Sequence, residues 1–123
     1  MPAYCRAKLA NILFTRQLSK RLADDNIVTH AMHPGLVNSN FFNHGDDGMK
    51  HYLDDKKDKS KSPAEAADTL IWLASADAPG QMSSDYFYER AVIPTSAFAQ
   101  DAAAAERLWH ESEKLVSQSL GMK

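Results

Sequence analysis

The strongest constraint on the fold is a long helical stretch that leads through a short turn into an apolar strand. Residues 4–22 are dominated by strong helix formers, and neither glycine nor proline interrupts them, which predicts a helix. Residues 23–26 read ADDN, which is typical of a turn, and residues 27–33 open with three β-branched side chains, which predicts a strand. A helix joined by a short turn to a largely apolar strand is one half of a β-α-β crossover. The sequence therefore predicts an α/β fold, with the other strand of the crossover expected before Met1.

A charged segment follows this unit. Pro34 and Gly35 end the predicted strand, and five aspartates and five lysines lie between Asp46 and Lys61. Such a composition cannot bury enough apolar surface to form a core of its own. Residues 36–61 are therefore predicted to be a solvated flap.

A second helix begins after the flap with a clear start signal. Ser62 and Glu65 have the S-x-x-E spacing of a capping box, and Pro63 stands at the first helical position. Apolar residues then recur at helical spacing up to residue 75. This pattern predicts a helix over residues 63–75.

The C-terminal part predicts one more strand and one more helix. Residues 83–93 are typical of a short strand with a tail, and residues 101–121 of an amphipathic helix that Asp101 caps and Gly121 ends. We expect this last helix to cover the last strand of its own sheet. The predicted order is helix, strand, flap, helix, strand, helix.

Composition and charge exclude several classes of function. The chain has 123 residues, a charged share of 24% and a net charge of -2, as expected for one ordinary globular domain and not for a nucleic-acid surface. Cys5 is the single cysteine, so no internal disulfide can form. No apolar run approaches the roughly 20 residues of a membrane span, and the first residues lack a secretory layout, so a cytoplasmic location is the default expectation. No metal site is predicted, because a strand places His30 and His33 on opposite faces.

One stripe of the first helix carries candidate chemistry. Tyr4, Lys8 and Asn11 follow at i, i+4 and i+7, so they stand on one helix face amid mostly small or apolar residues. An unperturbed tyrosine has a pKa of about 10, and a neighbouring ammonium lowers the pKa of a phenol toward the range useful for proton transfer. The alternative interpretation is structural: a half-buried tyrosine beside a lysine that reaches to water.

Three further segments of the chain are informative when they are taken together. They are YCRAKLANILFTRQLSKRL, VTHAMHPGLVNSNF and SPAEAADTLIWLAS with its C-terminal continuation. Together they resemble the short-chain dehydrogenase/reductase family, in its retinol-dehydrogenase and WW-domain-containing-oxidoreductase branch. The resemblance implies a doubly wound Rossmann sheet, NAD or NADP as cofactor, and hydride transfer between nicotinamide and a carbonyl or alcohol. It also implies that Tyr4 is the catalytic acid/base and that Lys8 assists it and binds the nicotinamide ribose.

The resemblance also assigns the remaining site residues within a single partial domain, with a catalytic helix and strand at 1–35, a flap at 36–61 and a helix–strand–helix at 62–121. The residues implied to bind the cofactor, besides Lys8, are Pro34, Gly35, Val37 and Ser39. Those implied to line the substrate pocket from the flap are Phe41, Phe42, Met49, Tyr52 and Leu53. The flap's many charges leave a steroid or a short aldehyde or ketone as alternatives to a retinoid.

The family's glycine-rich phosphate-binding turn does not occur in this sequence, whose glycines lie at 35, 45, 48, 80 and 121. The expectation is therefore the C-terminal part of such an enzyme without its nucleotide-binding half, inactive alone. Two alternatives stay open. One is a non-catalytic interaction module that pairs with a full-length subunit, or forms a homodimer, through the first helix. The other is a truncated gene product without function.

Overall fold

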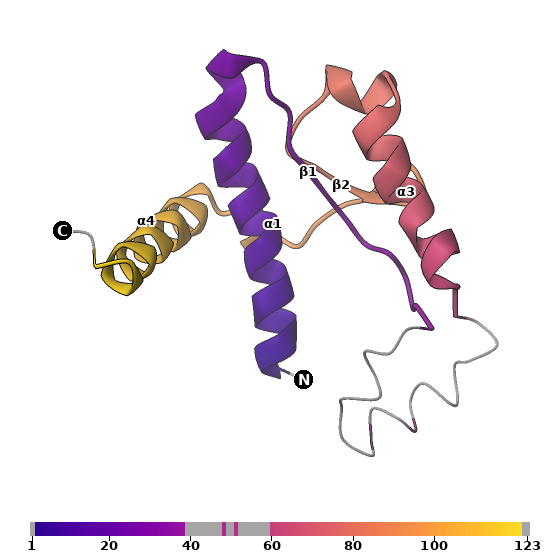
Figure 1. Cartoon of the computed structure of the whole chain (residues 1–123), viewed down its shortest axis with the longest axis horizontal. Helices are drawn as coiled ribbons and strands as arrows, with labels where there is room; N and C mark the ends of the chain where they lie inside the picture. Colours follow the sequence, from indigo (N-terminus) through magenta and orange to yellow (C-terminus); the bar gives the residue numbers. More distant parts are fainter. Residues whose placement is uncertain (1, 39–47, 49–50, 52–59, 122–123) are drawn as a thin grey trace.

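The computed structural model describes residues 2–38, 48, 51 and 60–121, which form a small α/β unit. Figure 1 shows a layer of short strands between two helices, with a further helix outside them. The elements in chain order are α1 (Pro2–Leu22), η1 (Ala23–Asp25), β1 (His30–Met32), α3 (Pro63–Ser75), η4 (Ala78–Gln81), β2 (Asp85–Tyr88), β3 (Ala91–Val92), η5 (Phe98–Gln100) and α4 (Ala102–Ser119). Within this described part, no helix is long and apolar enough to cross a bilayer.

The described strands form a mixed sheet in the order β1-β2-β3. β1 and β2 are parallel, and Ala31 is the register partner of Tyr86. β2 and β3 are antiparallel, so the single strand predicted over residues 83–93 is a hairpin. The described sheet is therefore mixed, whereas the doubly wound sheet that the family resemblance implies is parallel. The physical reason is the two-residue turn at Glu89 and Arg90, because a connection that short can join only antiparallel strands.

The sheet has a helix on each face. Ala31 and Tyr86 contribute to a cavity shared with α1, whereas Phe87 on the other face lies edge-on to the ring of Trp72 in α3, with ring centroids 5.7 Å apart. Phe87 is 1% exposed, and the ring of His30 packs against it at 5.0 Å. This residue is therefore the centre of the core between the sheet and α3.

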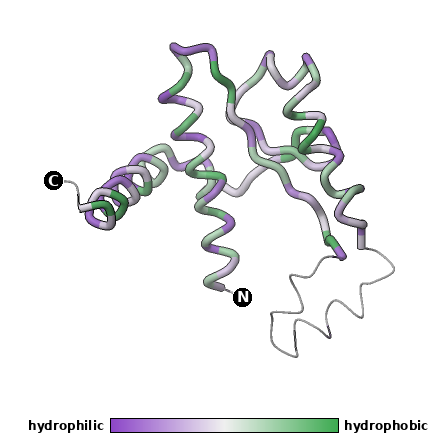
Figure 2. Tube along the Cα trace, in the orientation of Figure 1, coloured by the Kyte–Doolittle hydropathy of each residue, from purple (hydrophilic) through white to green (hydrophobic). Residues whose placement is uncertain are grey.

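α4 packs against α1 and not over the last strand, which corrects the expectation from the sequence. Phe14 of α1 stacks on Trp109 with ring centroids 5.5 Å apart, and the Arg21 guanidinium lies 4.5 Å from the same indole. Hydrophobic and hydrophilic residues are interleaved along α4 (Figure 2), as a helix with one packed face requires. Amphipathicity alone predicts such a face but does not identify its partner.

The predicted helix ends are confirmed. The Ser62 hydroxyl accepts a hydrogen bond from the Glu65 amide, and the Glu65 carboxylate accepts one from the Ser62 amide, which completes the capping box. Asp101 accepts a hydrogen bond from the Ala104 amide. Gly121 has a φ of 68° after the end of α4, a conformation that favours glycine.

The first strand is shorter than its sequence predicts. Only residues 30–32 pair with β2, and Ile27 and Val28 remain 49% and 39% exposed. The other edge of β1 has no neighbouring strand among the residues that the structure describes. The β-branched residues Ile27 and Val28 therefore lie outside the β1–β2 pairing, because β2 is the one described neighbour of β1 and pairs only with residues 30–32.

Candidate functional site

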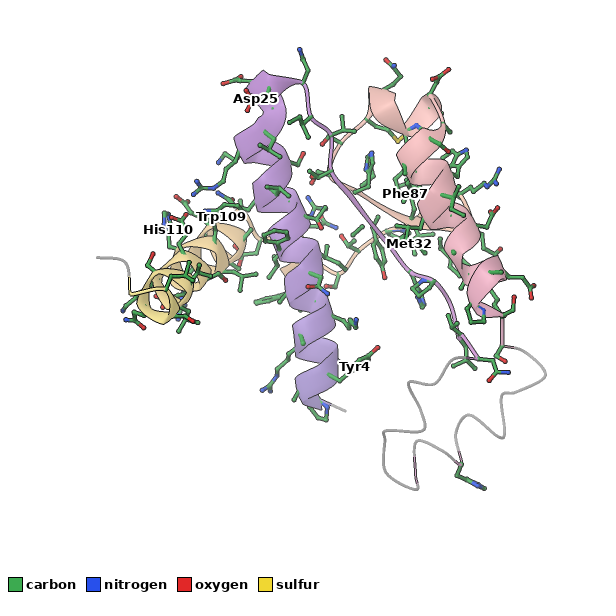
Figure 3. The ribbon with its side chains drawn as sticks, in the orientation of Figure 1. Tyr4, Asp25, Met32, Phe87, Trp109 and His110 are labelled. Atoms are coloured by element: carbon green, nitrogen blue, oxygen red, sulfur yellow. The ribbon has the colours of Figure 1, made fainter. Side chains whose placement is uncertain are left out.

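A cavity of about 510 Å³ lies between the N-terminal half of α1 and the carboxyl end of β1. In Figure 3 the Tyr4 side chain projects from α1 on the side that faces β1. The cavity is lined by Tyr4, Cys5, Lys8, Leu9, Asn11 and Ile12 from α1, by residues 31–35, and by Tyr86 from β2. The α1 side of the cavity carries a polar stripe of Tyr4, Lys8 and Asn11, and His33 and Tyr86 add polar rings from the sheet side.

The stripe carries a phenol and an ammonium at close range. The Lys8 ammonium nitrogen lies 5.5 Å from the centroid of the Tyr4 ring. The Tyr4 side chain is 41% exposed, so a ligand entering the cavity could reach its hydroxyl. The i, i+4 spacing of a regular helix produces this arrangement, since α1 runs without a break from Pro2 to Leu22.

The opposite wall is the turn that ends β1. His33 is bound to the sheet through its amide, which donates to the Phe87 carbonyl at 2.7 Å, and its ring Nδ1 accepts a hydrogen bond from the Gly35 amide at 3.2 Å. Gly35 has a φ of 80°, and a Cβ added there would lie 3.4 Å from a ring carbon of Tyr88. Glycine at this position therefore permits both the conformation and the close contact.

The structure brings together four of the residues predicted for the site and separates one. Tyr4, Lys8, Pro34 and Gly35 line the same cavity. Val37 does not line it, and instead forms a parallel bridge with Lys61. Ser39, Phe41, Phe42, Met49, Tyr52 and Leu53 lie outside the described residues.

Among the cavity residues that sequence reasoning missed, His33 and Tyr86 are the two that carry polar ring side chains. Burial raises the pKa of the Tyr86 phenol above its ordinary value of 10.0, because a phenolate loses solvation in the cavity wall. The alternation of side chains along residues 85–88 could have placed Tyr86 opposite Phe87 in the sheet. Only the register with Ala31 of β1 places it beside α1.

The geometry of the cavity indicates a general class of protein. The described residues form an α/β unit whose cavity lies at the carboxyl end of a parallel strand, where open α/β proteins bind their ligands. A phenol–ammonium pair on one wall provides a proton donor or acceptor within reach of a small polar ligand.

Comparison with known proteins shows which family of α/β proteins this chain is similar to. No protein-family model matches the chain. Human retinol dehydrogenase 12 is 36% identical over 120 residues, which are 93% of this chain and 36% of that protein. Human retinol dehydrogenase 14 is 37% identical over 123 aligned residues, 92% of this chain and 34% of that protein, and human retinol dehydrogenase 13 is 33% identical over 119. The chain is homologous to these retinol dehydrogenases of the short-chain dehydrogenase/reductase family, and it spans about a third of their length.

Proposed function

We propose that this chain carries the nicotinamide side of an oxidoreductase site of the short-chain dehydrogenase/reductase type. The observation that carries the proposal is the cavity in which Tyr4 and Lys8 of α1 face Pro34 and Gly35 at the end of β1. The homology to retinol dehydrogenases supports it, because the matched segment includes most of this chain. The reaction is the interconversion of a carbonyl and an alcohol with NAD or NADP.

The residues present fit the nicotinamide and its ribose. A cavity of about 510 Å³ falls within the range of about 300–1,000 Å³ that small-molecule sites have. Lys8 offers hydrogen-bond donors to ribose hydroxyls, and the Pro34–Gly35 turn lines the same cavity on the β1 side. Lys8, Pro34 and Gly35 would hold this group. The family resemblance also assigns Val37 and Ser39 to the cofactor, although Val37 does not line this cavity. When bound, it supplies or accepts the hydride at the substrate carbon.

Tyr4 transfers the proton that accompanies the hydride. In the reductive direction its hydroxyl gives a proton to the oxygen of the former carbonyl, and in the oxidative direction its phenolate takes the proton of the alcohol. The Lys8 ammonium, whose nitrogen lies 5.5 Å from the centroid of the Tyr4 ring, is the charged group that assists this proton transfer. The hydride adds to the carbonyl carbon and the proton to its oxygen, and together they convert the carbonyl into an alcohol.

The phosphates of the cofactor need residues that this sequence does not contain. Its five glycines form no glycine-rich turn of the type that binds a pyrophosphate at a helix N-terminus. We therefore expect turnover only where the remaining part of a doubly wound Rossmann sheet is supplied, and expect this chain alone to be inactive.

A chimera tests the proposed function. Residues 1–123 would replace the matched third of human retinol dehydrogenase 12, and turnover of short aldehydes, ketones and a retinoid would be measured with NADH and NADPH. Tyr4→Phe should lower kcat by about 100-fold or more, the usual contribution of a positioned acid/base, with cofactor affinity little changed. Tyr86→Phe is the matched control, because it removes a phenol hydroxyl from the same cavity at β2. A folded chimera in which Tyr4→Phe keeps its turnover would overturn the mechanism.

A second function, as an interaction module, is favoured by the exposure of α1. Residues 2–8 of α1 are exposed, while the face further along that contains Phe14 already packs on α4. A homodimer, or a pair with a full-length subunit, would thus use the N-terminal half of α1. Light scattering after size exclusion would show a dimer that Ala7→Glu dissociates and that Ala78→Glu in η4 leaves intact. A monomer at all concentrations would exclude the homodimer.

A further inference from the structure

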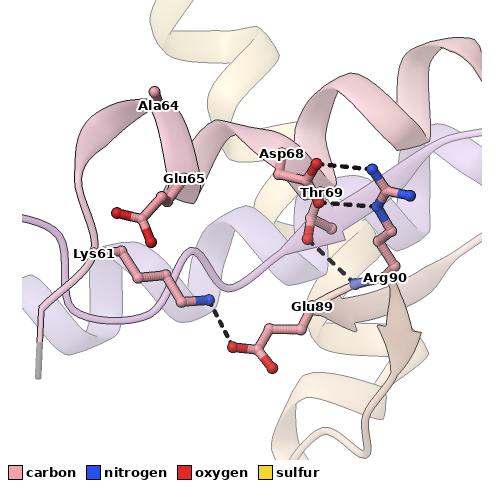
Figure 4. Close-up of a pocket in the computed structure, with 7 residues that line it drawn as sticks. All are labelled: Lys61, Ala64, Glu65, Asp68, Thr69, Glu89 and Arg90. Atoms are coloured by element: carbon pink, nitrogen blue, oxygen red, sulfur yellow. Dashed lines mark hydrogen bonds and ion pairs between the residues drawn. The ribbon is translucent and has the colours of Figure 1, made fainter.

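A second hollow, of about 620 Å³, lies where α3 begins and β2 turns into β3 (Figure 4). Two ion pairs lie beside each other there. The Lys61 ammonium is 2.8 Å from a Glu89 carboxylate oxygen, and the Arg90 guanidinium donates two hydrogen bonds to Asp68, at 2.7 and 2.9 Å. Both acidic partners have pKa values below their ordinary range, because each carboxylate accepts hydrogen bonds from its cationic partner.

The Arg90 pair holds the β2–β3 turn on α3. Glu89 and Arg90 have φ values of 49° and 64°, in the left-handed region that side chains disfavour. The Arg90 amide donates to the Thr69 hydroxyl at 3.2 Å, and the Arg90 side chain is bound by Asp68. These contacts join the turn to α3 and involve no residue of the candidate site.

The Lys61–Glu89 ion pair is connected to the residues that follow the Gly35 turn and to the end of β2. The Lys61 amide donates to the Leu36 carbonyl, and the Lys61 carbonyl accepts from the Asn38 amide, both at 2.8 Å. The Lys61 ammonium also lies 4.8 Å from the centroid of the Tyr88 ring. Lys61 therefore binds the residues that follow the Gly35 turn through its backbone, and the end of β2 through its side chain.

Tyr88 completes the connection to the cavity wall. Its ring lies 5.5 Å from the ring of His33, and a Cβ on Gly35 would approach a Tyr88 ring carbon to 3.4 Å. The Tyr88 hydroxyl also helps to lower the pKa of the Glu89 carboxyl by hydrogen bonding. One chain of contacts thus runs from Glu89 through Lys61 and Tyr88 to the turn that lines the cavity.

We propose that Lys61, Tyr88 and Glu89 form a clamp, which holds residues 36–38 through the Lys61 backbone and thereby positions the Pro34–Gly35 turn against the cavity. They are positioning residues, because only the turn, and not the clamp, faces the space that a ligand would occupy. The clamp's consequence for catalysis rests on the proposed function, but its effect on the turn does not. The chemistry is that of a partly exposed ion pair whose ammonium also lies over an aromatic ring.

Amide hydrogen exchange of the 123-residue chain, followed by NMR, tests the clamp. Glu89→Gln and Lys61→Met should each speed exchange of the Asn38 amide by about two- to five-fold, the effect expected for loss of one exposed ion pair. The amides of His33 and Ile93, which donate within the sheet, should exchange as in the parent chain. Asp68→Asn is the matched control: it breaks the neighbouring ion pair in the same hollow and should leave Asn38 unchanged.

Two results would overturn the clamp. One is unchanged exchange at Asn38 in both Glu89→Gln and Lys61→Met, and the other is an equal acceleration at Asn38 in Asp68→Asn or across the whole sheet. In the chimera, Glu89→Gln should raise the KM for the cofactor by about two- to five-fold at unchanged kcat, a separation that a general loss of stability does not produce. If the exchange pattern holds and Tyr4→Phe keeps its turnover, the clamp stands and the proposed function fails.

Discussion

Phe87 should be the most costly large side chain to remove from this fold. It is 1% exposed and lies between Trp72 of α3 and His30 of β1. Replacing a buried phenylalanine by alanine costs about 3–5 kcal/mol, because transfer free energy is lost and a cavity remains. Domains of this size have a total stability of about 5–15 kcal/mol, so Phe87→Ala should leave the fold marginal.

Urea unfolding followed by circular dichroism measures this effect. With a slope of about 1–3 kcal/mol per molar urea, the midpoint of Phe87→Ala should fall by about 1 M or more at an unchanged slope. Phe98→Ala is the matched control, because Phe98 is 56% exposed and should shift the midpoint far less. Equal shifts for the two variants, or a loss below about 1 kcal/mol for Phe87→Ala, would refute the assignment of Phe87 to the centre of the core.

Three further predictions concern turns, caps and pH. Ser62→Ala removes the capping box at α3 and should cost about 1 kcal/mol in urea unfolding; an unchanged midpoint would show that α3 needs no cap. Gly35→Ala places a side chain at a φ of 80° and against Tyr88, so it should cost about 1–2 kcal/mol, and a neutral effect would mean that the turn can rearrange. The pKa values of Glu65 and Asp68 lie below their ordinary 4.5 and 3.8 through hydrogen bonds from Ser62 and from Arg90. Their stabilisation is therefore complete above about pH 4.5 and lost as the pH falls through the folded-state values, which acid titration of the urea midpoint would show; a midpoint that rises on acidification would contradict it.

The helices of this fold could be predicted from sequence because their signals are local. The capping box at Ser62 and Glu65 and the unbroken stretch of α1 are each read from neighbouring residues. The stripe that carries Tyr4 and Lys8 follows from the same helical spacing. These features do not depend on what the helices pack against.

The features that sequence could not predict depend on contacts between distant segments. Glu89 and Arg90 adopt the left-handed conformation without the Asn-Gly signal of a tight hairpin, since contacts with α3 and Lys61 hold them in place. Tyr86 joins the cavity only through the register of β2 with β1. Val37 lies outside the cavity because Lys61, far along the chain, bonds to the backbone on either side of it.

The packing partner of α4 also depends on contacts between distant segments. Its pattern predicted one buried face, and Trp109 does stack on Phe14. An indole can be buried equally well against a sheet or a helix, so the sequence alone could not choose between them.

The most direct test of the central claim is to titrate this chain with the two halves of the cofactor separately and follow its amide NMR signals. Reduced nicotinamide mononucleotide should shift the signals of Lys8 and Gly35 with a Kd of roughly 1 mM, as expected for half of a dinucleotide site, whereas adenosine monophosphate should leave them unchanged. Tyr4→Phe should retain this binding, because the proposal assigns Tyr4 to proton transfer and not to affinity. Shifts with adenosine monophosphate alone, or shifts with either nucleotide that avoid the cavity residues, would contradict the claim that this cavity is the nicotinamide side of an oxidoreductase site.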